Sequence, residues 1–101
     1  MSRPLALKRV LAEPSVAYFK PAGISLRLIN EVSLGVEEFE ALRLVDFLCL
    51  AQEKAASKMG VSQPTLSRVL SSARKKVAGA ISNGMALRVE GGSYELAKRR
   101  G

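Results

Sequence analysis

The longest periodic pattern in the chain lies between Ser62 and Gly84. At 100° of rotation per residue, five apolar side chains fall on one stripe, as in an amphipathic helix. That stripe consists of Leu66, Val69, Leu70, Ala73 and Val77. Ser62 is a favourable N-cap, Pro64 suits a first helical turn, and Asn83-Gly84 is a typical helix end. The pattern predicts a helix that begins after Ser62 and ends near Gly84, with the stripe in the core.

A shorter helix is predicted from Gln52 to a sharp glycine turn. Ala55 and Ala56 are small enough for two helix backbones to approach closely, and Gly60 can adopt the positive φ that the turn requires. Residues 52–71 therefore have the pattern of a helix-turn-helix, whose second helix lies in the major groove of DNA.

A third helix is predicted from about Val36 to Leu48, and it is apolar around most of its circumference. We expect it to support the other two helices from within the core. Its first turns hold Glu37, Glu38 and Glu40, where carboxylates interact favourably with the helix dipole. Paired carboxylates can also perform acid–base chemistry, but the sequence supplies no accompanying nucleophile or metal ligand.

Extended segments are predicted before these helices, within residues 1–34. Residues 16–19 have the pattern of a short extended piece, and Val32–Leu34 that of a strand leading into the first helix. Between them, Ile24, Leu26 and Leu28 alternate as in a strand.

The C-terminal part, residues 85–101, has the pattern of a β-hairpin followed by a basic tail. Gly91-Gly92 separates residues 87–90 from residues 93–96, and a two-residue glycine turn is typical of hairpins. Cross-strand pairing would set Val89 opposite Tyr94, Leu87 opposite Leu96, and Arg88 opposite Glu95. Such a hairpin could contact DNA as a wing, or it could instead cap the core or offer an edge for dimerisation.

Charge is distributed very unevenly along the chain. The formal net charge is +7, yet residues 1–53 hold six Lys or Arg against seven Asp or Glu, a balance of −1. Residues 54–101 hold ten against two, a balance of +8. Clustered positive charge indicates a polyanion-binding surface, although a solvated basic face is the plainer interpretation when charge is considered alone.

Several kinds of chemistry are not supported by the sequence. The chain has no His and a single cysteine, Cys49, so one chain cannot build a zinc cluster, a disulfide or a Cys-His pair. Cys49 stands in an apolar context and is expected to be a buried structural thiol. No apolar run is long enough for a membrane span and no secretory signal is evident, so we expect a cytoplasmic protein. Because no catalytic or metal-binding group of residues is present in the sequence, we expect neither a cofactor nor enzymatic activity.

The candidate DNA-binding residues lie at the start of the longest helix and along its polar side. They are Ser62, Gln63, Pro64, Thr65, Ser67, Arg68, Ser71, Ser72, Arg74, Lys75 and Lys76. Gln63 can pair with adenine and Arg68 with guanine, each contact contributing about 1–3 kcal/mol of discrimination. The hydroxyls suit phosphate or base contacts, and residues 74–76 suit the phosphate backbone. An ordinary solvated helix face is the alternative interpretation of residues 74–76.

Ungapped motifs over nearly the whole length carry a family resemblance. They are Tyr18-Phe19-Lys20-Pro21-Ala22-Gly23-Ile24, Glu38-Phe39-Glu40-Ala41-Leu42-Arg43-Leu44, Met59-Gly60-Val61-Ser62-Gln63-Pro64-Thr65, Ala73-Arg74-Lys75-Lys76-Val77-Ala78 and Ala86-Leu87-Arg88-Val89-Glu90-Gly91-Gly92. Through them the chain resembles an uncharacterised family of small prokaryotic predicted DNA-binding proteins. The helix-turn-helix of that family is similar to region four of sigma-70-type factors. The resemblance implies DNA binding. This chain departs from the family pattern at Gly35, where relatives often have Ser or Thr before the support helix.

Together these patterns predict a single, mainly α domain over residues 1–101. A tri-helical helix-turn-helix core (residues 35–84) would follow the short N-terminal extended segment and precede the C-terminal β-hairpin. The expected function is sequence-specific binding of double-stranded DNA by a transcriptional regulator. A homodimer is expected because one recognition helix reads too few base pairs for specificity in a genome. The alternatives are a non-enzymatic protein-interaction module that docks as sigma-like domains do, and RNA binding through the same basic face.

Overall fold

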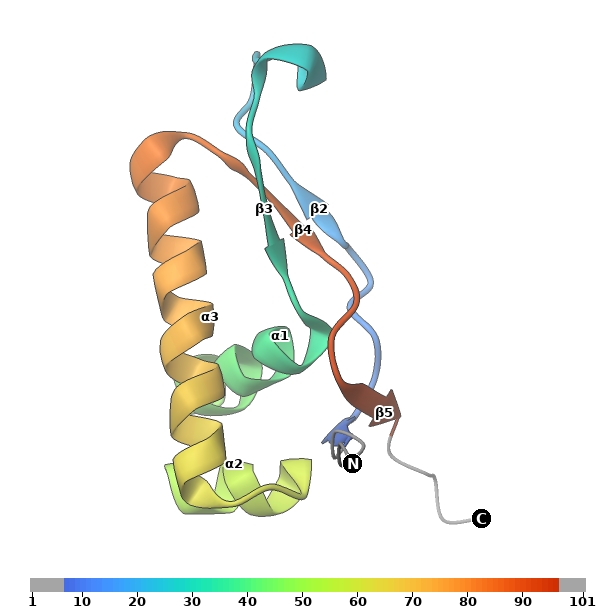
Figure 1. Ribbon diagram of the computed structural model, residues 1–101, viewed down its shortest axis with the longest axis vertical. Coiled ribbons are helices and arrows are strands. Elements are labelled where there is room, and N and C mark those ends of the chain that lie inside the picture. Colours follow the sequence, from blue (N-terminus) through green and yellow to red (C-terminus); the bar gives the residue numbers. More distant parts are fainter. Residues whose placement is uncertain (1–6, 97–101) are drawn as a thin grey trace, which may run out of the picture.

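The computed structural model describes residues 7–96, so the predicted basic tail, residues 98–100, lies outside the described residues. The chain runs through β1 (Lys8–Val10), β2 (Tyr18–Phe19), the 3-10 turn η1 (Leu26–Leu28), β3 (Glu31–Leu34), α1 (Val36–Leu42), the π-helical η2 (Arg43–Phe47), α2 (Gln52–Met59), α3 (Gln63–Asn83), β4 (Ala86–Val89) and β5 (Tyr94–Leu96). Figure 1 shows α3 as the long upright helix, with α1 and α2 beside its N-terminal half and the strands β2, β3 and β4 beside its C-terminal half. The prediction of a small, mainly α domain with some β-structure is confirmed for this part of the chain. None of the described helices combines the length and the apolar character needed to cross a membrane.

α3 begins and ends where its local sequence predicted. The Ser62 hydroxyl caps the helix by accepting a hydrogen bond from the amide of Thr65, at 3.2 Å. At the other end Gly84 takes the left-handed conformation, with φ 62°, and donates its amide to the carbonyl of Ala80. Leu66, Leu70 and Ala73 of the predicted stripe are buried. The amphipathic interpretation of this helix is therefore confirmed.

The core consists of two apolar clusters, both of which contact α3. The first fills the space between α1, η2, α2 and α3, and comprises Ala41, Leu44, Ala55, Ala56, Met59, Leu66 and Leu70. The second joins α3 to the strands, and comprises Val10, Leu34, Val36, Ala73 and Val89. Ala55 and Ala56 are fully enclosed in the first cluster, as expected where helices pack closely. α3 is thereby held along one side for most of its length.

The predicted support helix has nearly the expected extent, but its second half is π-helical. In η2 the amide of Leu48 donates to the carbonyl of Arg43, five residues earlier, at 2.9 Å. The π-helical turn changes the rotation per residue, so the 3.6-residue period used for the prediction does not hold at its end. Phe47 and Cys49 are exposed, and Cys49 has a positive φ of 60°. The prediction that Cys49 is a buried structural thiol is wrong for this reason.

The C-terminal strands form, but the predicted hairpin pairing between them is wrong. β4 is the central strand of a three-stranded sheet, antiparallel to β2 and parallel to β3. Both of its edges are therefore occupied, and β5 pairs in parallel with β1 instead. The expected pairs of Val89 with Tyr94, Leu87 with Leu96, and Arg88 with Glu95 do not form.

The two glycines cross the start of α1 instead of closing a hairpin. The amide of Val36 donates to the carbonyl of Gly91 at 3.0 Å, and the Glu37 carboxylate accepts the amide of Ser93 at 3.1 Å. A Cβ on Gly92 would collide with the Glu37 side chain. Gly92 also has a φ of 97°, so the backbone conformation favours glycine here, whereas the Glu37 carboxylate could move aside.

The N-terminal segment is only partly as predicted. Tyr18 and Phe19 form β2, and the predicted strand before the first helix is present as β3. The expected strand through Ile24, Leu26 and Leu28 is wrong, because this stretch forms η1 at the tip of the connection between β2 and β3. Ser25 caps that turn by accepting a hydrogen bond from the amide of Arg27 at 3.4 Å. The alternation of apolar residues does not indicate this local hydrogen bond.

Candidate nucleic-acid interface

The connection between α2 and α3 is a tight turn at Gly60. Gly60 has a φ of 67°, and its amide donates to the carbonyl of Ser57 at 3.1 Å. The next amide, of Val61, donates to the carbonyl of Ala56 at 3.0 Å. The guanidinium of Arg9, on β1, covers the turn and lies 2.8 Å from where a Cβ on Gly60 would stand. A residue other than glycine would be strained by this φ, while the flexible Arg9 side chain could move aside.

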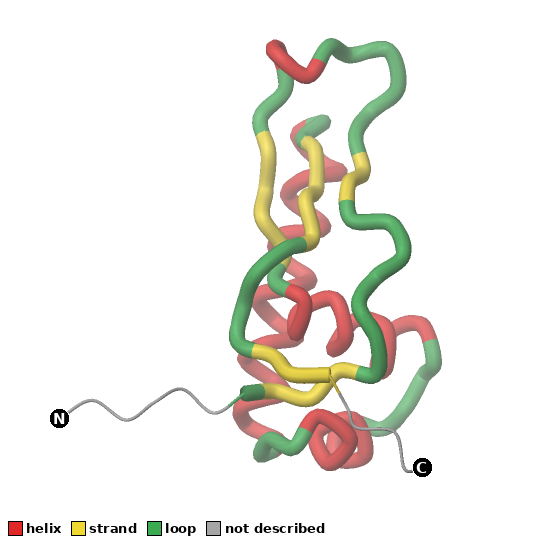
Figure 2. The backbone as a smooth tube through the Cα atoms, turned by 90° about the vertical axis from the view of Figure 1, so that its right-hand side faces the viewer, coloured by secondary structure: helices red, strands yellow, loops and turns green. Residues whose placement is uncertain are grey.

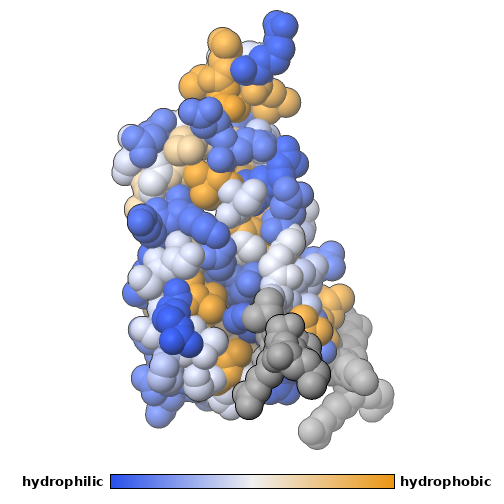
Figure 3. Space-filling view, in the orientation of Figure 1, coloured by the Kyte–Doolittle hydropathy of each residue, from blue (hydrophilic) through white to orange (hydrophobic). Residues whose placement is uncertain are grey.

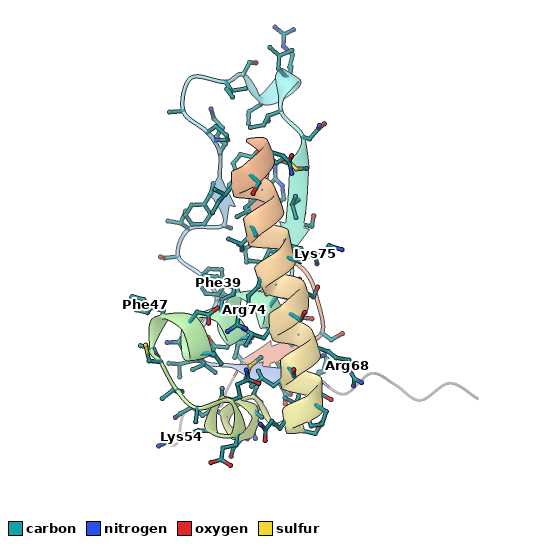
Figure 4. All side chains as sticks on the ribbon, turned by 90° about the vertical axis from the view of Figure 1, so that its left-hand side faces the viewer. Phe39, Phe47, Lys54, Arg68, Arg74 and Lys75 are labelled. Atoms are coloured by element: carbon teal, nitrogen blue, oxygen red, sulfur yellow. The ribbon has the colours of Figure 1, made fainter. Side chains whose placement is uncertain are left out.

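The outer side of α3 carries polar groups that contact little of the rest of the protein. Gln63, Ser67, Arg68, Ser71 and Lys75 are all exposed. Within residues 7–96, the one side-chain hydrogen bond made by any of them joins Arg68 to the hydroxyl of Thr65, at 3.5 Å. Pro64 is exposed in the first turn, where its missing amide hydrogen costs no hydrogen bond. Figure 4 shows Arg68 and Lys75 pointing to the same side of α3.

Two of the predicted site residues, Ser72 and Lys76, are instead bound to a buried carboxylate. Glu38 of α1 accepts hydrogen bonds from the Ser72 hydroxyl at 2.6 Å, from the Lys76 ammonium at 2.7 Å and from the Gly35 amide at 2.8 Å. Burial alone would raise the pKa of Glu38, but the hydrogen bonds from Lys76, Ser72 and Gly35 outweigh it and lower that pKa below its usual value. This cluster joins the first turn of α1 to the middle of α3.

Arg74 is also paired, on the opposite flank of α3. Its guanidinium forms two hydrogen bonds with the Asp46 carboxylate of η2, at 2.7 and 3.1 Å. These bonds lower the pKa of Asp46 despite its partial burial. Half of the Arg74 side chain and 40% of the Asp46 side chain remain exposed, so this ion pair is accessible to solvent.

The remaining candidates lie where the sequence placed them. Ser62 is exposed and occupied as the cap of α3, where its hydroxyl also bonds to Thr65 at 2.9 Å. Thr65 is half-buried between the turn and Arg68. The structure therefore divides the predicted set into a free group along the outer side and a group that is bound to α1 and η2.

Three further cations lie on α2 or beside the turn, and the sequence interpretation did not include them. Lys54 and Lys58 are exposed on α2, four residues apart, and this spacing alone could have indicated a shared basic side. Arg9 reaches the same end of the molecule from β1, with its Nη2 atom 3.4 Å from the carbonyl of Ser57. No local pattern could have placed Arg9 there, because its position depends on the pairing of β1 with β5.

The acidic residues of α1 all make structural contacts. Glu40 binds Arg43 at 2.6 Å and the amide of Leu11 at 2.8 Å. Glu37 accepts the amide of Ser93, and Glu38 accepts hydrogen bonds from α3 and from Gly35. No group of three potential metal ligands occurs among residues 7–96. Figure 3 shows that the side of the molecule seen in Figure 1 is largely hydrophilic, with small separate apolar areas.

These features define a class of small three-helix domain with accessory strands and an exposed, cationic helix side. Residues 1–97 match the family described as "Protein of unknown function DUF134", and the chain belongs to this family. No solved structure matches it.

The relatives are bacterial proteins of closely similar sequence. The "UPF0251 protein" of Halothermothrix orenii is 55% identical over 98 residues, which cover 97% of this chain and 73% of the relative. The "UPF0251 protein" of Moorella thermoacetica is 56% identical, over 95% of this chain and 64% of the relative. A third, "UPF0251 protein DehaBAV1_0135" of Dehalococcoides mccartyi, is 52% identical, over 98% of this chain and 85% of the relative. The chain thus spans between about two thirds and about six sevenths of the length of these relatives.

Proposed function

We propose that the protein binds double-stranded DNA sequence-specifically through a helix-turn-helix formed by α2, the Gly60 turn and α3, and that it regulates transcription. The observation that carries the proposal is the free outer side of α3. Gln63, Arg68 and Lys75 are exposed there, while the opposite side of the same helix is fixed in the core. A recognition helix needs this combination of rigid support and unoccupied donors.

Under this proposal the N-terminal half of α3 enters the major groove. Gln63 and Arg68 then reach base edges, where an amide suits adenine and a guanidinium suits guanine. Ser67 and Ser71 lie beside them, and Lys75 reaches the phosphate backbone about two turns later. In other helix-turn-helix proteins the first helix crosses the DNA backbone. The cations Lys54, Lys58 and Arg9 suit that contact in this protein.

The ion pairs on α3 refine the roles of the cations. Lys76 is bound to the buried Glu38 and serves mainly to orient α3. Arg74 is bound to the accessible Asp46, so a DNA phosphate can replace that carboxylate without exposing a buried charge. The free cations Arg68 and Lys75 therefore provide most of the contribution of α3 to DNA affinity. Arg74 contributes only where a phosphate replaces Asp46.

The test is selection of bound fragments from a randomised duplex pool at two ionic strengths. We expect enrichment of a defined sequence and a steep loss of affinity at the higher salt concentration, because neutralised phosphates release counterions. The absence of enrichment at either salt concentration would contradict the proposal. Tighter binding to duplex RNA of the same sequence would favour the RNA alternative, and binding to neither would leave protein docking as the better account.

A further inference from the structure

An apolar groove lies on the side of the molecule away from the free cations of α3. It has a volume of about 690 Å³ and is lined mainly by aromatic and aliphatic side chains from β2, β4, α1, η2 and α3. Phe19, Phe39, Phe47, Val77 and Leu87 are among them. In Figure 4 Phe39 and Phe47 lie on one side of α3, whereas Arg68 and Lys75 lie on the other.

The groove continues along the C-terminal half of α3. A smaller hollow of about 210 Å³ shares Phe19 and Leu87 with it and is also lined by Ile81 and Met85. Phe47 is 78% exposed, Ile81 75% and Phe19 51%. Figure 2 shows that β2 and η2, which carry Phe19 and Phe47, lie on the same side of the molecule. These residues form one continuous apolar strip, here called the Phe19–Phe47–Ile81 strip.

We infer that the Phe19–Phe47–Ile81 strip is the contact surface between two copies of this chain, related by a two-fold axis. The exposed area agrees with this occupant. At about 150–250 Å² for an aromatic side chain and somewhat less for Ile, the three residues expose about 400 Å² of apolar surface. A stable interface buries about 800 Å² per partner, of which about 65% is apolar in homodimers, or about 500 Å². With the partly buried residues of the groove, the strip is of the size that a homodimer requires.

The charge of the strip also favours a second copy. Each chain has a formal net charge of +7, so two copies can approach only through a surface with little net charge of its own. Arg43 and Asp46, which line the larger groove, have opposite charges and are each already bound within the chain. The strip adds only Lys20, from the smaller hollow, to this balanced pair. A partner selected by charge, such as an acidic protein, would find little to recognise here.

The strip and the free cations of α3 lie on opposite sides of the molecule, so the two outer sides of α3 face away from each other in this dimer. The existence of the dimer does not depend on DNA binding.

The test uses the full chain without DNA, in sedimentation equilibrium over a range of concentrations. We expect a dimer for the wild type, and a dissociation constant raised by about 100-fold or more in Phe47→Lys and in Ile81→Lys, because central interface residues dominate affinity. Both positions are highly exposed, so circular dichroism and thermal unfolding should be unchanged. Leu28→Lys is the matched control, because Leu28 is 83% exposed on η1 and does not line the strip; it should remain dimeric.

Two results would overturn the inference. One is a wild-type protein that stays monomeric at all concentrations, and the other is a dimer that both lysine variants leave intact. The proposed function is tested separately by the enriched sequence. A monomer that still selects a single half-site would contradict the dimer and support DNA binding, whereas a dimer that selects no sequence would do the reverse.

Discussion

Four cations on α3 divide into two pairs that the sequence does not distinguish. Arg68 and Lys75 are exposed and form no ion pair within residues 7–96, whereas Arg74 and Lys76 are bound to Asp46 and Glu38. All four belong to one helix, and residues 74–76 are consecutive. The difference arises because α1 and η2 lie under both flanks of α3 but not under its outer side. Positive charge on this helix therefore has two uses, one in holding the helix and one in remaining available to a ligand.

The largest expected effect is on stability, from removal of the carboxylate that binds Lys76. In Glu38→Gln the Lys76 ammonium, the Ser72 hydroxyl and the Gly35 amide lose a charged acceptor. We expect a loss of about 2 kcal/mol in the free energy of unfolding, which is below the usual value for a buried pair because Lys76 is partly solvated. Chemical denaturation measures it. Glu95→Gln, at an exposed strand position with the same change of charge, should stay within about 0.5 kcal/mol of wild type.

The next effect is on sequence preference, from removal of the free Arg68. In Arg68→Ala we expect discrimination between the selected site and its single-base variants to fall by about 1–3 kcal/mol at one position, with stability unchanged. Competition binding with those variants measures it. Arg27→Ala removes the same charge from the exposed turn η1 and should leave the preference intact. Unaltered selectivity in the Arg68 variant would exclude this residue from base recognition.

The pH dependence of the free energy of unfolding is expected to reflect the titration of the Glu38 carboxylate. The pKa of Glu38 is lowered on folding, so its contribution to stability is complete above the pKa of the unfolded chain, about 4.3, and is lost as the pH falls through the lower, folded-state value. The wild type should therefore lose more stability than Glu38→Gln on acidification from neutral pH to below that range. Parallel stability curves for the two proteins would show that Glu38 does not titrate in this way.

A smaller effect should separate the neighbouring lysines. In Lys75→Ala we expect all duplexes to bind more weakly by a similar factor, and the slope of log affinity against log salt to fall by about 0.9. Lys76→Ala should change that slope much less, since its ammonium is already bound to Glu38. Anisotropy titrations at several salt concentrations measure both slopes. Equal changes in the two variants would remove the distinction between free and bound cations.

The smallest effect is expected from releasing Arg74. In Asp46→Asn its guanidinium loses a charged partner and becomes available to phosphate without competition. We expect affinity for duplexes of any sequence to rise by a few fold at low salt, with a salt slope steeper by up to about 0.9. Titration with an unselected duplex measures it. Weaker binding than wild type would indicate instead that Asp46 is needed to orient Arg74.

The helices could be predicted from the sequence because their signals are local. Ser62, Gly60 and Gly84 act on their immediate neighbours, and the stripe of α3 repeats within one element. The hairpin could not be predicted correctly, because Gly91-Gly92 indicates a turn but not which strands are free to pair. β4 takes partners from residues 18–19 and 31–34, and β5 takes its partner from residues 8–10.

The candidate site was predictable to a similar degree. The outer side of α3 follows from its period, so the exposed positions of Gln63, Arg68 and Lys75 could be predicted. The pairing of Ser72 and Lys76 with Glu38 could not, because it joins residues 34 and 38 positions apart in the sequence. The π-turn of η2 was also unpredictable, and it both exposes Phe47 and Cys49 and carries Asp46 close to Arg74.

The most direct test of the central claim is amide chemical-shift mapping of the protein during titration with a short DNA duplex at low salt. We predict that the largest shifts occur between Ser62 and Lys75 and at the Gly60 turn, and that they diminish together as salt is added. Shifts confined to the Phe19–Phe47–Ile81 strip, or no saturable shifts at all, would contradict the assignment of α3 as the surface that binds DNA.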